Sequence, residues 1–159
     1  MRKQSKQTSN TQKTKGSIRI IAGKHRGRKL PVVLAEGLRP TTDRVKETVF
    51  NWLMPYVQDS TCLDCFSGAG SLGFEAYSRG AKHVTLLELN KAAATQLKAN
   101  QQLLSATNTD IIQVDTLAFL QQTPKIFDLV FIDPPFRQDL INQTISLLNQ
   151  GWLKTNAII

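Results

Sequence analysis

The fold is decided by the stretch Asp64-Cys65-Phe66-Ser67-Gly68-Ala69-Gly70-Ser71-Leu72-Gly73. It lies where an apolar strand pattern over 61–66 gives way to a helical pattern over 71–78. Its glycines let the backbone turn tightly, let a ligand approach closely and let the helix pack against the strand. Because a plain tight turn also uses glycines, the Gly-x-Gly-x-x-Gly motif indicates a cofactor-binding turn only in this strand-to-helix context.

Strand and helix patterns alternate around this turn without a long linker. We predict strands over 61–66, 83–88, 109–114 and 126–132 and helices over 71–78, 91–104, 116–122 and 139–149. This order requires parallel strands joined by right-handed crossovers, so we predict an α/β, doubly wound, mostly parallel sheet with helices on both faces. The last residues, 157–159, resemble the opening of a further strand. We therefore expect the sequence to be C-terminally incomplete; if the chain ended here, strand 126–132 would lose a neighbour and expose an apolar edge.

Positive charge is concentrated at the front of the chain. The net charge is +8, and residues 1–50 carry 13 Lys or Arg against three acidic residues. A concentrated cationic surface favours a polyanion such as nucleic acid. We predict three parts: a disordered basic arm over 1–17, a basic N-terminal β-hairpin over 18–42 and the α/β domain over 43–159.

A helix is predicted to lead into the α/β domain. It starts at Asp43 as N-cap and ends near Pro55. Lys46 is expected on its solvated face, and Trp52 and Trp152 are expected to be packing residues. The expected core face of the helix comprises Val45, Val49 and Leu53.

Acidic residues near the strand ends indicate a cofactor that carries a nucleoside. Glu88 ends the second strand of the domain, where a carboxylate can accept hydrogen bonds from ribose hydroxyls. Both NAD and S-adenosylmethionine fit this pattern. Asp64 beside the turn opposes a pyrophosphate and suits a cationic sulfonium and ammonium. Asp115 can accept from an adenine amine, although acidic residues at strand ends also cap helices.

The sequence Asp133-Pro134-Pro135-Phe136 follows the apolar strand 126–132 and favours methyl transfer. The Asp133 carboxylate and the Pro134 carbonyl form an acceptor pair that suits an exocyclic amine, and Phe136 offers a face for stacking a planar base. Holding both amine hydrogens on acceptors directs the lone pair towards an electrophilic methyl group, which is catalysis by orientation.

These residues together resemble the class I S-adenosylmethionine-dependent amino-methyltransferases. The front of the chain is more specific: Arg19-Ile20-Ile21-Ala22-Gly23-Lys24, Arg26-Gly27-Arg28-Lys29-Leu30 and the run from Leu38 to Leu53 resemble the bacterial RsmD family. That family methylates the N2 amine of one guanine in small-subunit (16S) ribosomal RNA. The likeness begins near Ser17, and the strands that the family has beyond the fourth, including a C-terminal hairpin, are missing.

The resemblance implies a role for each matching position. The cofactor-binding residues are Asp64, Phe66, Ser67, Gly68, Gly70, Glu88, Asp115, Thr116 and Leu117. The catalytic residues that grip the guanine are Asp133, Pro134 and Phe136. The RNA-binding residues are Lys24, Arg26, Arg28, Lys29, Arg39, Thr41, Asp43 and Arg44. An amine within a helix is inaccessible, so the target base must be unpaired or flipped out.

Other function classes compete with this one. A methyltransferase of the same fold could act on adenine or cytosine amines of DNA, and an RNA-binding ribosome assembly factor could keep a vestigial cofactor pocket. A dehydrogenase is a further alternative. Cys62 and Cys65 precede the glycine turn rather than opening a helix, so we predict no redox or metal site. We expect a cytoplasmic monomer without a membrane segment, with 16S ribosomal RNA or the small subunit as its partner.

Overall fold

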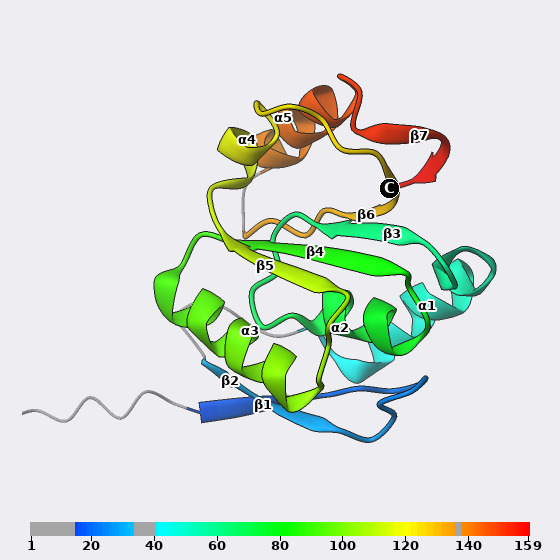
Figure 1. Cartoon of the computed structure of the whole chain (residues 1–159), viewed down its shortest axis with the longest axis vertical. Helices are drawn as coiled ribbons and strands as arrows, with labels where there is room; N and C mark the ends of the chain where they lie inside the picture. The colour runs from blue at the N-terminus through cyan, green and yellow to red at the C-terminus, as the bar shows by residue number, and fades with distance from the viewer. Residues whose placement is uncertain (1–14, 34–40, 136–137) are drawn as a thin grey trace, which may run out of the picture.

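A five-stranded parallel sheet forms the centre of the molecule (Figure 1). The computed structural model describes residues 15–33, 41–135 and 138–159. Along the sheet the strand order is β5-β4-β3-β6-β7. The strands are β3 (Thr61–Asp64), β4 (His83–Glu88), β5 (Thr109–Gln113), β6 (Phe127–Phe131) and β7 (Leu153–Ile158).

Helices cover both faces of the sheet, which confirms the predicted doubly wound α/β architecture. In Figure 1, α1, α2 and α3 lie below the sheet and α4 and α5 lie above it. The helices are α1 (Asp43–Val57), α2 (Ser71–Ser78), α3 (Lys91–Leu103), α4 (Thr116–Phe119) and α5 (Gln138–Leu148). The four strands and four helices predicted around the glycine turn are therefore all present, with boundaries that shift by up to three residues at the ends.

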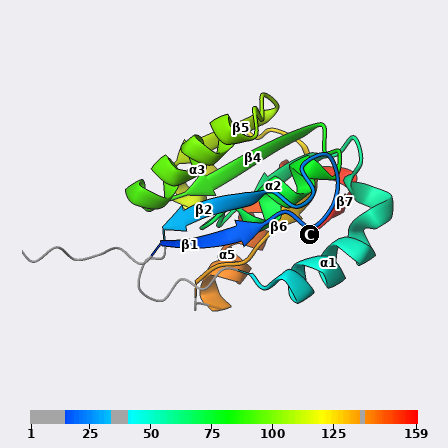
Figure 2. The same ribbon diagram turned by 90° about the horizontal axis from the view of Figure 1, so that it is seen from below.

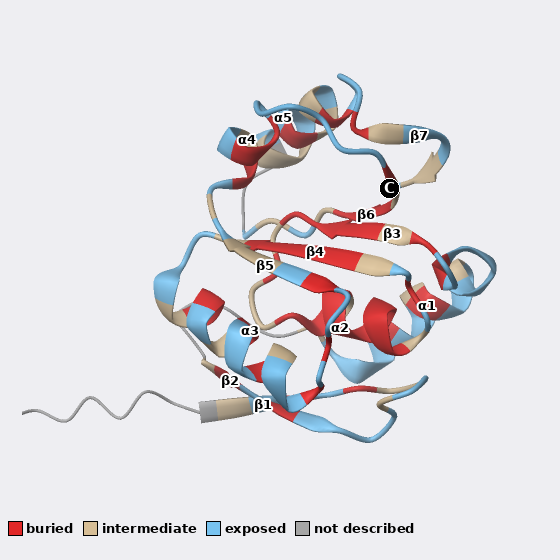
Figure 3. Ribbon diagram, in the orientation of Figure 1, coloured by how far each residue is buried: buried red, intermediate tan, exposed pale blue. Residues whose placement is uncertain are grey.

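Successive residues of the central strands enter two different cores. Cys62 packs in the core beneath α1, α2 and α3, whereas its neighbour Leu63 packs in the core beneath α4 and α5. The same alternation divides Leu129 from Val130. Because side chains alternate across a strand, a strand covered on both faces is apolar throughout. Figure 3 shows β3, β4 and β6 as the most buried part of the sheet.

The strand order reverses next to β3. The chain first builds outwards from β3 to β4 and β5, and then returns to place β6 on the other side of β3. In open α/β sheets, ligands bind outside the carboxyl ends of the strands at such a switch point. The topology therefore predicts a ligand site at the residues that follow β3 and β6.

The N-terminal hairpin packs outside the helix layer. β1 (Lys15–Arg19) pairs with β2 (Lys29–Val33) in antiparallel register, and Figure 2 shows both strands lying across the helices. The hairpin buries Ile18, Ile20, Leu30 and Val32 in the same core as α2 and α3. The first strand begins at Lys15 rather than at the predicted position 18, because its register pairs Lys15 with Val33. Residues 1–14 of the predicted arm lie outside the described residues.

Helix α1 differs from its prediction in three ways. Its N-cap is Thr42, whose side chain accepts a hydrogen bond from Val45 N at 3.3 Å, so Asp43 is the first helical residue. The helix continues through Pro55 to Val57, since a proline in the last turn removes few backbone hydrogen bonds. The residues that it buries are Lys46, Phe50 and Val57.

The predicted core face of α1 is consequently rotated by about one residue. Val45 is 52% exposed and Trp52 is 72% exposed, so neither is a packing residue. Lys46, expected in solvent, is 1% exposed. Trp152, by contrast, is buried as predicted, and its indole nitrogen donates to the Leu120 carbonyl at 3.1 Å.

The strand at the end of the chain is longer than predicted. β7 pairs with β6 in parallel, starting with Phe127 opposite Leu153, so the further strand expected at 157–159 is present, and strand 126–132 has a neighbour instead of an exposed edge. The pairing could not be read from the sequence because residues 153–156 are mostly polar and resemble a loop. Among the described residues, no helix has both the length and the apolar character needed to cross a membrane.

Candidate active site

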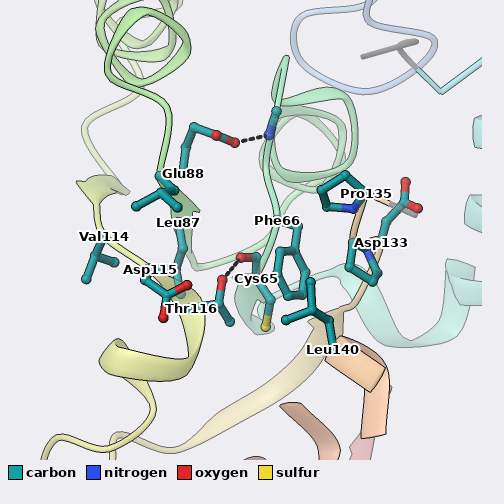
Figure 4. A pocket seen from close by; sticks show the side chains of 13 residues that line it. Cys65, Phe66, Leu87, Glu88, Val114, Asp115, Thr116, Asp133, Pro135 and Leu140 are labelled. Atoms are coloured by element: carbon teal, nitrogen blue, oxygen red, sulfur yellow. Dashed lines mark hydrogen bonds between the residues drawn. The ribbon is translucent and has the colours of Figure 1, made fainter. Parts of the chain in front are cut away.

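A pocket of about 820 Å³ opens at the carboxyl ends of the strands (Figure 4). Its size falls within the roughly 300–1,000 Å³ of small-molecule sites. Its lining combines three carboxylates with apolar side chains. The lining residues are Cys65, Phe66, Gly68, Leu87, Glu88, Leu89, Val114, Asp115, Thr116, Asp133, Pro134, Pro135 and Leu140.

The glycine turn forms one wall of the pocket. Gly70 is the N-cap of α2 and has φ of 85°, a left-handed conformation that favours glycine. A Cβ at Gly73 would lie 2.6 Å from a methyl carbon of Leu86, so the glycine lets α2 pack closely on β4. The turn therefore meets both requirements that the motif predicted, a tight reversal and a close helix–strand approach.

Asp64 supports the turn from within the protein. It is 1% exposed, and one carboxylate oxygen accepts a hydrogen bond from Gly73 N at 3.2 Å. The other oxygen is buried and has no hydrogen-bond partner among the described residues. Burial raises the pKa of Asp64 to about 7, while the Gly73 bond opposes the shift and Asp133 adds to it. Asp64 does not line the pocket, and neither do Ser67, Gly70 and Leu117.

The carboxylates of Glu88 and Asp115, both predicted from the sequence to bind the cofactor, line the pocket. Glu88 accepts from Gly68 N at 2.7 Å and from Asn90 N at 3.0 Å, which ties the end of β4 to the glycine turn. Asp115 caps α4 by accepting from Ala118 N at 3.1 Å, so the structural role considered for it is present. Each carboxylate keeps acceptor capacity, because an ionised carboxylate has about four lone-pair positions.

The other side of the pocket is built by the residues after β6. Asp133 and Pro134 line the pocket, and in Figure 4 Asp133 lies across Phe66 from Glu88. Phe136 lies outside the described residues. Thr116 fixes the floor of the site, since its hydroxyl donates to the Cys65 carbonyl at the end of β3.

Sequence reasoning missed the apolar lining of the pocket. Cys65, Leu87, Leu89, Val114, Pro135 and Leu140 all line it. All of them except Leu140 are next to a predicted site residue near the end of a strand. Their position near a strand end is therefore the sequence signal that could have identified them. Leu140 comes from α5 and had no signal, because only the tertiary fold brings that helix over the strand ends (Figure 4).

The basic residues of the hairpin do not lie at the pocket. The turn over residues 23–28, called here the basic turn, contacts the C-terminal end of α2, where Lys24 N donates to the Ser78 carbonyl at 2.8 Å. The glycine turn precedes the N-terminal end of the same helix. One guanidinium nitrogen of Arg28 donates to the Leu103 carbonyl at 3.0 Å. Lys29 opens β2 and is exposed.

The other predicted RNA-binding residues that the structure describes do not line the pocket either. Thr41, Asp43 and Arg44 are absent from the pocket lining, and Arg39 lies outside the described residues. Asp43 instead forms a 3.1 Å ion pair with Arg19 of the hairpin.

The two cysteines are buried free thiols. Burial raises the pKa of Cys62 to about 12 and raises the pKa of Cys65 as well. A thiol with a raised pKa is a poor nucleophile and metal ligand, because the thiolate is the reactive form. No group of three or more potential metal ligands occurs among the described residues.

The fold and the pocket define a Rossmann-like class I methyltransferase. Residues 18–159 match the family model described as "Conserved hypothetical protein 95". The chain is 58% identical over 154 residues to the "Ribosomal RNA small subunit methyltransferase D" of Haemophilus influenzae, covering 94% of this chain and 80% of that protein. The chain belongs to this family, as the sequence resemblance predicted.

Three further proteins are similar to the chain, the first two in sequence and the third in fold alone. The protein of the same name from Escherichia coli strain K12 is 51% identical, over 91% of this chain and 73% of that one. The solved structure of yhhF from Escherichia coli has a TM-score of 0.83 at 48% identity and covers 89% of this chain and 78% of that chain. At 19% identity, the structure of a Thermus thermophilus 16S rRNA N2 G1207 methyltransferase shares the fold with a TM-score of 0.67, over 89% of this chain and 39% of that one.

Proposed function

We propose that the protein transfers a methyl group from S-adenosylmethionine to the exocyclic N2 amine of a guanine in small-subunit (16S) ribosomal RNA. The observation that carries the proposal is the pocket at the strand ends, in which Glu88 lies on one side and Asp133 on the other (Figure 4). Pro134, which follows Asp133, lines the same pocket. Membership of the ribosomal RNA small subunit methyltransferase D family supports the reaction class and the substrate.

The residues present fit a cationic nucleoside cofactor. Bound S-adenosylmethionine would supply an electrophilic methyl group on a sulfonium. Glu88, Leu89 and Val114 line the pocket together. Glu88 would accept from ribose hydroxyls, and the apolar side chains of Leu89 and Val114 would contact the adenine. The Gly73 N–H in the first turn of α2 is already bonded to Asp64, so a pyrophosphate at this helix end would meet a carboxylate. This arrangement disfavours a dinucleotide.

The acceptor side of the pocket is suited to an amine that is a poor nucleophile. The lone pair of the guanine amine is conjugated into the ring. If the Asp133 carboxylate and the Pro134 carbonyl each accept one N–H, the lone pair turns away from the ring towards the methyl donor. Asp133 is exposed at the pocket, so an approaching base can reach its carboxylate. The proton released on transfer can then pass to that carboxylate or to solvent.

The experiment that tests this proposal removes the Asp133 acceptor. We expect Asp133→Ala to lower methyl transfer to unmethylated small ribosomal subunits at least 100-fold while S-adenosylmethionine binding, measured by calorimetry, persists. Asp110→Ala is the matched control, because Asp110 is an exposed carboxylate that pairs with His83 away from the pocket. Wild-type transfer by the Asp133 variant would contradict the acceptor mechanism.

The predicted RNA contact of the hairpin has its own test. Neutralising Arg26, Arg28 and Lys29 together should weaken binding to small ribosomal subunits and flatten its salt dependence, since each lost phosphate contact reduces the slope of log K against log salt by about 0.7–0.9. Lys154→Ala on β7 is the control for a general loss of charge. An unchanged salt slope would remove these residues from the RNA interface.

The competing functions make different predictions in the same assays. A DNA methyltransferase would modify duplex DNA and leave small subunits unmodified. An assembly factor with a vestigial pocket would bind subunits without binding S-adenosylmethionine. With this activity, we expect the protein to act in the cytoplasm, where its substrate resides, and to act as a monomer.

A further inference from the structure

A buried carboxylate on α2 holds the segment that leads into the basic turn. Glu75 is fully buried, and its oxygens accept from Ile21 N at 3.0 Å and from Ala22 N at 3.1 Å. Arg79 donates to the same carboxylate at 2.9 Å, and the Lys46 ammonium lies 3.6 Å from it. Burying a carboxylate is costly unless it is paired and hydrogen-bonded, and Glu75 has both kinds of partner.

The ammonium of Lys46 extends this arrangement to α1. It donates to the Arg19 carbonyl at 2.6 Å, at the end of β1. Burial lowers the pKa of Lys46, whereas Glu75 and Asp43 act to raise it. One carboxylate therefore joins three elements that are distant in sequence: the hairpin, α1 and α2.

Ser78, one turn further along α2, holds the basic turn itself. Its hydroxyl accepts from His25 N at 2.9 Å and donates to the Ala22 carbonyl at 2.7 Å. Its own carbonyl accepts from Lys24 N at 2.8 Å. A Cβ at Gly23 would lie 2.0 Å from that carbonyl oxygen, so the turn lies directly on the helix. We call Glu75 and Ser78 with these bonds the α2 clamp.

The methyltransferase mechanism proposed above makes no use of this clamp. The helix that carries it spans eight residues, about 12 Å, from the glycine turn to Ser78. One end of α2 therefore borders the cofactor pocket, and the other end carries the basic turn. A short helix is rigid, so the spacing between its two ends is fixed. The distance from the pocket to the basic turn is fixed as well only while the α2 clamp attaches the turn to the helix.

We propose that Glu75 and Ser78 are positioning residues for RNA recognition, which hold the basic turn at a fixed distance from the methyl-transfer pocket. This inference rests on the proposed function, because it takes Lys24 and Arg26 to contact RNA phosphates. The clamp supplies no contact to RNA itself. It removes the conformational freedom that the turn would otherwise lose on binding.

The test is a double-mutant cycle measured as affinity for unmethylated small ribosomal subunits. Ser78→Ala should weaken binding about fivefold, the equivalent of one hydrogen bond, and Glu75→Gln should weaken it at least as much. Lys24→Ala combined with Arg26→Ala removes the two cations that the inference assigns to phosphate contact, and Arg28 keeps its hydrogen bond to the Leu103 carbonyl. In that double variant the Ser78 substitution should have no further effect on RNA affinity, since the turn then has neither of those phosphate contacts left to misplace.

Two controls separate positioning from loss of stability. Thr144→Val removes a fully buried hydroxyl that has no hydrogen-bond partner in the described part of the chain, so it should leave RNA affinity unchanged. S-adenosylmethionine affinity should also be unchanged in the Ser78 variant. The Ser78 variant keeps the test valid if Glu75→Gln fails to fold, because Glu75 and its partners remain.

The outcomes distinguish this inference from the function on which it rests. If the fold-changes in subunit affinity caused by the Ser78 substitution and by the turn substitutions multiply in the combined variant, the clamp acts through general stability, and the positioning role is overturned. If the doubly neutralised turn binds subunits as tightly as the wild type, the RNA contact of the turn fails, and the positioning role fails with it. Methyl transfer to subunits by the wild-type protein tests the proposed function independently of both results.

Discussion

The buried carboxylate of Asp64 makes stability depend on pH in an unusual direction. Its pKa is raised from 3.8 to about 7, chiefly by burial. Each pKa unit corresponds to about 1.4 kcal/mol, so ionising Asp64 in the folded protein costs about 4 kcal/mol. Asp64 ionises near pH 4 in the unfolded chain and near pH 7 in the folded protein. The destabilisation of the folded protein by Asp64 therefore grows as the pH rises from 4 to 7 and reaches its full value above pH 7.

Asp64→Asn removes the ionisation while keeping an oxygen that can accept from Gly73 N. We expect the variant to be more stable than the wild type by about 4 kcal/mol above pH 7, with the gain shrinking as the pH falls towards 4. The free energy of unfolding, measured by urea denaturation of the unliganded protein between pH 4 and 8, gives this difference directly. A difference that stays constant across that range would refute the reasoning.

Asp128 provides a control of opposite sign. Its carboxylate accepts from Thr61 N at 2.8 Å and pairs with Lys154 at 3.3 Å, and these contacts lower its pKa. A lowered pKa means that the ionised form stabilises the fold at neutral pH and that this contribution is lost in acid. Asp128→Asn should therefore destabilise the protein at pH 7, and the two proteins should converge as the pH falls below 4.

Two further predictions concern packing. Gly23 and Gly27 both have left-handed φ angles, but only at Gly23 would a Cβ meet the Ser78 carbonyl. We expect Gly27→Ala to cost about 1–2 kcal/mol of stability, and Gly23→Ala to lower the thermal midpoint much further. Equal thermal midpoints for the two variants would contradict the close approach of Gly23 to α2. Trp152→Ala should lower the free energy of unfolding, measured by urea denaturation, by about 3–5 kcal/mol, because Trp152 is buried against two phenylalanine rings. A decrease below about 1 kcal/mol would contradict a stabilising role for Trp152 in the core beneath α4 and α5.

Local pattern was enough to predict the parallel sheet and its glycine turn. The strand over His83–Glu88, the helix capped by Asn90 and the helix over Ser71–Ser78 match their predicted bounds closely. Each depends on neighbouring residues: strand periodicity, a capping side chain or a glycine that ends a helix. The same reasoning located Glu88 and Asp133, since residues that follow parallel strands gather at one edge of the sheet.

Contacts between distant elements decided what the sequence could not. Lys46 reads as a surface residue on its own helix, yet the carboxylate of Glu75 and the Arg19 carbonyl give a buried ammonium its partners. Likewise, the hairpin reads as a free basic finger, but its alternate apolar residues are buried against α2 and α3. Whether a charge or a strand is buried depends on its free energy of interaction with partner groups, and groups that are distant in sequence come together only when the chain has folded.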